Sequence, residues 1–217
     1  MNVHLCFHGV GTCVNEREPG ESRYWIRESV FLGLLEALAD HPEVRLSFDD
    51  GNRSDIGIAL PALRARDRRA TFFPLAGRLD DPASLSAVDL RALRANGMSI
   101  GSHGWSHVPW RGLSTADAQR ELVDARRVLE EASGGAVTEA ALPLGRYDRE
   151  SLRRLRQSGY RAVYTSDRYP TRSGSWLRAR YSVTADDTVG SVMAIACRGH
   201  GIRDARNLAK SLVKRVR

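Results

Sequence analysis

Residues 44–51 are Val44-Arg45-Leu46-Ser47-Phe48-Asp49-Asp50-Gly51, a short apolar run that ends in two adjacent carboxylates and a glycine. The run predicts a buried β-strand that brings Asp49 and Asp50 to the loop at its carboxyl end. Side chains alternate along a strand, but at its frayed end neighbouring residues can converge on one pocket. One acid could then bind a metal while the other moves protons. Acids beside a glycine are also common in turns, and the tripeptide alone leaves that alternative open.

A second segment carries two histidines four positions apart, in Gly101-Ser102-His103-Gly104-Trp105-Ser106-His107. Two imidazoles at this spacing can bind one ion from a single loop or helical turn, although such pairs also occur without a metal. Together with a carboxylate from the first segment, they would make a facial metal site with open coordination positions. The two segments therefore predict a metal centre.

These segments resemble the signature of the polysaccharide deacetylase family, the carbohydrate esterases that remove N-acetyl groups from amino sugars: Phe-Asp-Asp-Gly, followed by Ser-His-x-x-x-His. Three other segments are similar to further parts of the family pattern, at residues 69–77, 93–100 and 142–148. The last of these is Leu142-Pro143-Leu144-Gly145-Arg146-Tyr147-Asp148, which resembles the family's proline-glycine motif. The resemblance covers roughly residues 42–170.

Apolar runs alternate with segments of helical periodicity along the chain. Strands are predicted at residues 3–7, 44–48, 72–73, 98–100, 138–142 and 161–165, and helices at residues 25–40, 56–66, 89–96, 114–133, 149–157 and 202–216. This alternation predicts an α/β protein with a parallel sheet. The family resemblance implies an irregular (β/α)7-type barrel with its site at the carboxyl ends of the strands. The polar residues 12–24 would form a loop over that site.

The composition is that of an ordinary globular protein. The 217 residues suffice for one hydrophobic core and contain no repeat, so we predict one catalytic domain over residues 1–217. The 42% of hydrophobic residues excludes a largely disordered chain. The three cysteines are too few for a disulfide framework and suit a reducing compartment.

The first residues have no basic leader and no long apolar stretch, so we expect neither a secretory signal nor a membrane span, and a cytoplasmic location. A small-molecule amino-sugar compound would then be the substrate. The formal net charge is +7, but the basic residues are scattered and no nucleic-acid module is present. We therefore expect no nucleic-acid partner. Nothing in the sequence indicates the oligomeric state.

Residues 202–216 predict an amphipathic helix with a basic face. Its apolar face comprises Ile202, Ala205, Leu208, Leu212 and Val216, and its basic face Arg203, Arg206, Lys210 and Lys214. Such a helix can lie on a membrane or pack its apolar stripe on the core. We expect the second arrangement and no membrane partner.

The resemblance implies a role for each motif residue. Asp50, His103 and His107 would hold a divalent ion that polarises the amide carbonyl and acidifies a water molecule. Zinc is the first expectation, and cobalt, nickel, manganese or iron would also accept this ligand set. Asp49 would be the general base, because an ordinary carboxylate is ionised at neutral pH and can accept a proton.

The segment Leu5-Cys6-Phe7-His8 resembles a Leu-x-His motif that the family carries on its last strand, and that some members have permuted to the front. The resemblance implies that His8 is the general acid that protonates the leaving nitrogen. The alternative is a hydrogen-bonded structural histidine.

The chain departs from the family pattern at Ala141, where most members have an arginine that steadies the base. Arg146 is the candidate for the missing guanidinium and Asp167 the candidate that orients it, unless Arg146 is only a surface loop residue. Two functions follow. The first is metal-dependent hydrolysis of an N-acyl amide, with N-acetyl as the expected group, on a small amino-sugar compound. The alternative is a non-hydrolytic sugar-binding protein of the same fold.

Overall fold

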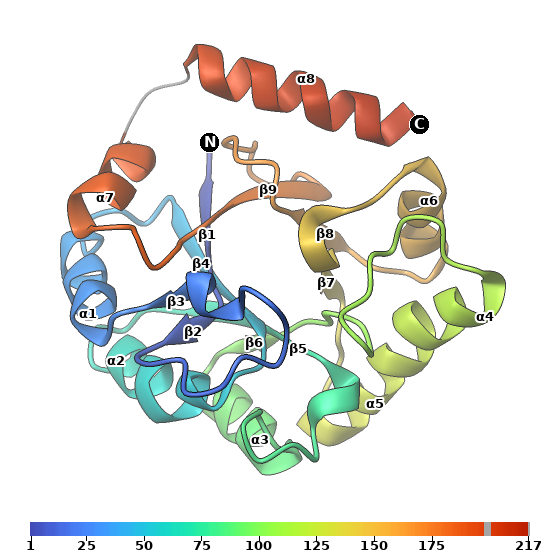
Figure 1. Cartoon of the computed structure of the whole chain (residues 1–217), viewed down its shortest axis with the longest axis horizontal. Coiled ribbons are helices and arrows are strands. Elements are labelled where there is room, and N and C mark those ends of the chain that lie inside the picture. The colour runs from blue at the N-terminus through green and yellow to red at the C-terminus, as the bar shows by residue number, and fades with distance from the viewer. Residues whose placement is uncertain (198–200, 217) are drawn as a thin grey trace.

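A seven-stranded parallel sheet forms the centre of the computed structural model, which describes residues 1–197 and 201–216. Its strands are β1 (Val3–Phe7), β4 (Val44–Asp50), β5 (Ala70–Pro74), β6 (Ser99–Ile100), β7 (Glu139–Ala141), β8 (Ala162–Thr165) and β9 (Leu177–Ser182). The order is β6-β5-β4-β1-β9-β8-β7, and a parallel bridge between Ser102 and Ala140 joins the two outer strands. The sheet thus closes almost completely into a barrel (Figure 1), which confirms the predicted fold class.

Helices surround the barrel (Figure 1). They are α1 (Glu28–Ala37), α2 (Leu60–Arg64), α3 (Ala87–Ala95), α4 (Thr115–Ala118), α5 (Ala125–Ser133), α6 (Arg149–Gln157), α7 (Val189–Cys197) and α8 (Ile202–Val216). π-Helical turns at Asp55–Ala59 and Gln119–Asp124 precede α2 and α5, and short 3-10 turns lie at Glu21–Tyr24, Ala76–Arg78 and Pro143–Gly145. A separate pair of short strands, β2 (Gly9–Val10) and β3 (Trp25–Ile26), lies beyond the end of β1. No helix in the described part of the chain is long and apolar enough to cross a bilayer.

Several elements differ from the sequence prediction. The first helix begins at Glu28 and not at residue 25, because Trp25 and Ile26 pair with β2. Strand β9 and helix α7 were not predicted. The signal for β9 was present, since Leu177, Ala179 and Tyr181 alternate with Arg178 and Arg180 in the period of a half-buried strand.

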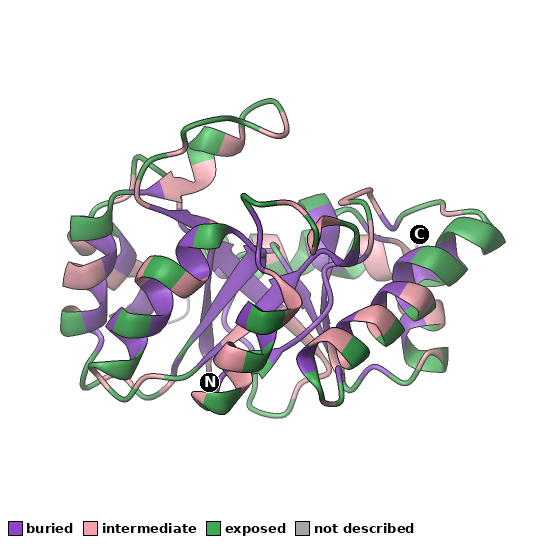
Figure 2. Ribbon diagram, turned by 90° about the horizontal axis from the view of Figure 1, so that it is seen from below, coloured by how far each residue is buried: buried purple, intermediate pink, exposed green. Residues whose placement is uncertain are grey.

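The register of the central strands determines which side chains enter the barrel. Phe7, Phe48 and Phe72 are direct neighbours across β1, β4 and β5, and the Phe48 and Phe72 rings stack at 4.7 Å. Phe31 of α1 packs against the Phe7 ring on the outer side of the sheet. Since side chains alternate, this outward aromatic row directs Asp49 to the barrel interior. Figure 2 shows the strands buried at the centre and the helices exposed on their outer sides.

Helix α8 faces the barrel with its polar side, whereas the prediction placed its apolar side there. Its buried side chains are the polar residues Asp204 and Ser211, whereas the apolar Ile202, Leu212 and Val216 are exposed. The expectation that α8 packs its apolar stripe on the core is therefore wrong. The surface beneath α8 explains this, because it presents polar groups, among them the Tyr147 and Tyr169 hydroxyls that bond Ser211.

Candidate metal and catalytic site

The carboxyl ends of the strands surround a cavity of about 280 Å³. Six side chains from the strand ends line it, namely His8, Asp49, Asp50, His103, His107 and Arg180. The loop of residues 12–24 forms one wall through Pro19, Gly20 and Tyr24, as its predicted position required. Six of the seven predicted site residues thus line this cavity, with Arg146 at its rim and Asp167 absent from it, at the end of the barrel where (β/α) barrels carry their active sites.

Asp49 is held by a buried ion pair. Arg180 of β9 donates from Nη1 to Asp49 Oδ1 and from Nη2 to Oδ2, both at 2.6 Å, and also donates to Ser47 Oγ at 3.1 Å. Both partners are almost fully buried, with 3% of Asp49 and 2% of Arg180 exposed. Burial alone would raise the pKa of Asp49, but Arg180 and His103 outweigh it and hold that pKa well below its ordinary value. Asp49 is therefore an ionised and rigidly oriented carboxylate.

This pair corrects the expectation for Arg146 and Asp167. Arg146 is exposed at the rim of the cavity, and its guanidinium has no hydrogen bond within the described residues 1–197 and 201–216. The Asp167 carboxylate instead accepts hydrogen bonds from the Tyr147 hydroxyl and the Lys214 ammonium, both at 2.6 Å. Arg180 thus takes the place beside the carboxylate that sequence reasoning assigned to Arg146.

Asp50, His103 and His107 form a group that can hold a metal ion. Asp50 Oδ1 lies 3.5 Å from Nε2 of each histidine, and the three potential ligand atoms lie within 4.8 Å of one another. That oxygen is buried and has no hydrogen-bond partner among the residues that the structure describes. An orphaned carboxylate oxygen facing two imidazole nitrogens fits a divalent cation.

The other ring nitrogens of both histidines have partners. His103 Nδ1 lies 2.9 Å from the Ala141 carbonyl oxygen, and His107 Nδ1 lies 2.6 Å from Glu18 Oε2. These contacts leave Nε2 of each ring free to act as a ligand. Burial also lowers the pKa of His103 to about 4, so its imidazole is neutral at pH 7. Glu18 was not predicted, since only the folded loop brings it to His107.

Two of the candidate ligands have strained backbones. Asp50 and His107 have φ angles of 71° and 56°, in the left-handed region that non-glycine residues avoid. Such a conformation costs about 1–3 kcal/mol per residue and is concentrated at functional sites. The surrounding fold holds both residues where their side chains meet.

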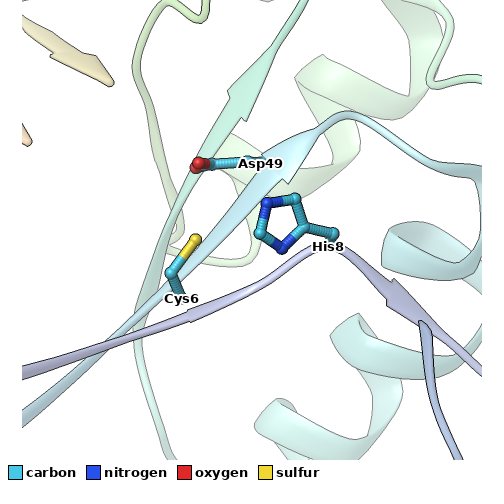
Figure 3. A group of neighbouring side chains, drawn as sticks. All are labelled: Cys6, His8 and Asp49. Atoms are coloured by element: carbon cyan, nitrogen blue, oxygen red, sulfur yellow. The ribbon is translucent and has the colours of Figure 1, made fainter. Parts of the chain in front are cut away.

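A second cluster joins Cys6, His8 and Asp49. Figure 3 shows the side chains of Cys6 and His8 directed toward Asp49, and one potential ligand atom of each lies within 4.8 Å of the others. Burial raises the pKa of the Cys6 thiol well above its ordinary value, and Asp49 is already paired with Arg180. Since Asp49 is committed to Arg180, this cluster fits a metal ion less well than the Asp50, His103 and His107 group. His8 Nδ1 is buried without a hydrogen-bond partner among the described residues, so the structural alternative for His8 finds no support there.

Asp55, in the π-helical turn after β4, is a further acid that sequence reasoning missed. It is fully buried, and neither carboxylate oxygen has a partner within the described part of the chain. Burial, reinforced by the charges of Asp50 and Asp49, raises its pKa well above the ordinary value. Asp55 is thus a buried acid beneath the site whose charged form is disfavoured, and its sequence position beside a helix start carried no signal of this.

A (β/α) barrel with a His-His-Asp group that could hold a metal ion and a fixed carboxylate at its mouth has the groups that metal-assisted hydrolysis uses. The family model described as polysaccharide deacetylase matches residues 38–163, and the chain belongs to this family.

Two curated relatives come from Bacillus subtilis (strain 168). YxkH is 27% identical over 124 residues, which are 57% of this chain and 44% of that protein. The peptidoglycan-N-acetylmuramic acid deacetylase PdaC is 33% identical over 104 residues, which are 47% of this chain and 21% of PdaC. The chain thus matches less than half the length of either relative.

Solved structures show the same fold. The Streptococcus pyogenes deacetylase PplD, in complex with acetate, has a TM-score of 0.78 at 18% identity, over 91% of this chain and 98% of that one. IcaB from Ammonifex degensii has a TM-score of 0.75 at 22% identity, over 90% of this chain and 97% of the IcaB chain.

Proposed function

We propose that this chain is a metal-dependent deacetylase that hydrolyses the N-acetyl amide of an amino-sugar compound. The observation that carries the proposal is the Asp49 carboxylate, fixed by two hydrogen bonds from Arg180 beside the Asp50, His103 and His107 group. Family membership supports the reaction class.

Asp50, His103 and His107 would hold the ion, and zinc, cobalt, nickel, manganese or iron would suit these ligands. Such an ion supplies a positive charge that polarises the amide carbonyl and lowers the pKa of a water molecule.

Asp49 would accept the proton of the attacking water. Its pKa is depressed, so it is ionised at neutral pH, and Arg180 orients both of its oxygens. The same ion pair makes Asp49 a weak base. It can therefore take a proton only from a water molecule whose own pKa is lowered, as the bound ion would lower it. His8 would donate a proton to the departing nitrogen, because it lines the same cavity and its ring lies beside Asp49.

The cavity supports a small substrate. Its volume of about 280 Å³ suits one amino-sugar ring, and the loop of residues 12–24 walls it on one side. PdaC is named for N-acetylmuramic acid in peptidoglycan, so a polymer is the competing substrate class. We retain a small amino-sugar compound, and with it the cytoplasmic location, as the proposal.

The non-hydrolytic alternative rested on Ala141 in place of the family arginine. Arg180 supplies a guanidinium to Asp49 from β9, so the alternative loses that support.

The test is an acetate-release assay on soluble N-acetylated amino sugars and on peptidoglycan fragments, after loading with each candidate metal. Asp49→Asn should abolish release, while Asp40→Asn, at an exposed acid outside the cavity, should leave it unchanged. No acetate from any substrate with any metal would refute the proposal.

A further inference from the structure

Helix α8 attaches to the barrel through polar contacts. The Tyr181 hydroxyl donates to Asp204 Oδ1 at 2.9 Å, and the Lys214 ammonium donates to Asp167 Oδ1 at 2.6 Å. Ser211 is fully buried and lies 2.9 Å from the Tyr147 hydroxyl oxygen. These residues fall on one side of the helix, so the orientation of α8 is determined by several independent hydrogen bonds.

The opposite half of α8 divides into two exposed stripes. At 100° per residue, seven apolar residues occupy one continuous arc, and three basic residues occupy the arc beside it. The apolar stripe comprises Ile202, Ala205, Leu208, Ala209, Leu212, Val213 and Val216, and the basic stripe comprises Arg203, Arg206 and Lys210, all of them exposed. The solvent-facing half of the helix is therefore amphipathic in its own right.

The apolar stripe is not a set of scattered surface residues. Ile202 is 91% exposed and Val216 76%, at opposite ends of a helix of 15 residues, with exposed apolar residues on every turn between them. A continuous exposed apolar surface of this kind marks an interaction site.

Charge indicates which partner fits. The one acid in α8 is Asp204, which is buried against the barrel, so the exposed half carries positive charge only. An apolar stripe edged by arginine and lysine matches an anionic lipid surface, where the stripe enters the boundary between headgroups and acyl chains and the cations meet the phosphates. A second copy packed on the same face would bring like charges together, which disfavours a symmetric dimer.

We propose that α8 binds the protein peripherally to anionic lipid membranes. In Figure 1 the helix runs along one side of the barrel, on the side opposite α2 and α3, and the residues of both stripes are exposed within the described part of the chain. The membrane would lie against this side and leave the cavity end of the barrel open.

The test is co-sedimentation of the purified protein with vesicles of phosphatidylglycerol and phosphatidylcholine, and with vesicles of phosphatidylcholine alone. Wild type should pellet with the anionic vesicles only. Arg206→Glu together with Lys210→Glu should lower the partition coefficient by about 30-fold or more. Leu208→Ser together with Leu212→Ser should lower it by about 100-fold.

The charge-matched control is Arg127→Glu together with Arg149→Glu, at exposed arginines of α5 and α6. This variant has the same net charge as the basic-stripe variant and should still pellet with anionic vesicles. Far-ultraviolet circular dichroism checks that every variant is folded, which is expected because all substituted side chains are exposed. Wild type that stays in the supernatant, or a control that loses binding equally, would overturn the proposal. So would a dimer in light scattering that Leu208→Ser with Leu212→Ser converts to a monomer, since a second copy would then cover the stripe.

Discussion

Replacing Arg180 with methionine should destabilise the protein strongly. Methionine keeps much of the side-chain volume but removes both hydrogen bonds to Asp49 and leaves that carboxylate buried without a counter-charge. Breaking one partner of a buried ion pair costs about 3–5 kcal/mol of the free energy of unfolding.

The size of this effect should depend on pH. In wild type the pKa of Asp49 is depressed, so its contribution to stability is present above the unfolded-state pKa of about 3.9 and is lost as the pH falls below it. In Arg180→Met, burial raises the pKa of Asp49, and the protonated acid is the better tolerated form. The stability gap between the two proteins should therefore be largest at pH 7 and shrink as the solution is acidified.

Urea unfolding followed by circular dichroism measures this gap at pH 7 and at pH 4. The double variant Asp49→Asn with Arg180→Met completes the comparison, because it removes both charges together and should be more stable than Arg180→Met alone. The reasoning fails if Arg180→Met unfolds within about 1 kcal/mol of wild type. It also fails if the double variant is no more stable than the single one.

Three further substitutions test individual site residues. His103→Ala should abolish stoichiometric metal binding, measured by elemental analysis, while the protein stays folded; full metal content would exclude the proposed ligand set. Glu18→Gln keeps the shape of the side chain but removes its charge beside His107, so the affinity for zinc, measured by competition with a chelator, should fall about 10- to 100-fold. An unchanged affinity would show that the 2.6 Å contact between Glu18 and His107 does not support metal binding. His8→Ala should slow N-acetyl hydrolysis far more than hydrolysis of an activated ester, whose leaving group needs no proton, and equal losses on both substrates would return His8 to a structural role.

Local patterns in the sequence were sufficient for the parallel sheet and for the strand ends that carry the site, whereas the closed barrel and the roles of the site residues came from the resemblance to the deacetylase family. The apolar run before Asp49 and the strand before His103 place both motifs at strand ends, because hydrophobic alternation depends only on near neighbours. In parallel strands those ends share one edge, which is why Asp50, His103 and His107 converge.

Contacts between distant segments depended on the tertiary structure alone. Arg180 reaches Asp49 across 131 positions and Glu18 reaches His107 across 89, and no local pattern encodes such pairings. The orientation of α8 also depends on contacts with distant segments. Periodicity locates its apolar stripe, but which side of the helix faces the barrel depends on the surface that receives it, and here that surface is made of the hydroxyls and carboxylates that bind Ser211 and Lys214.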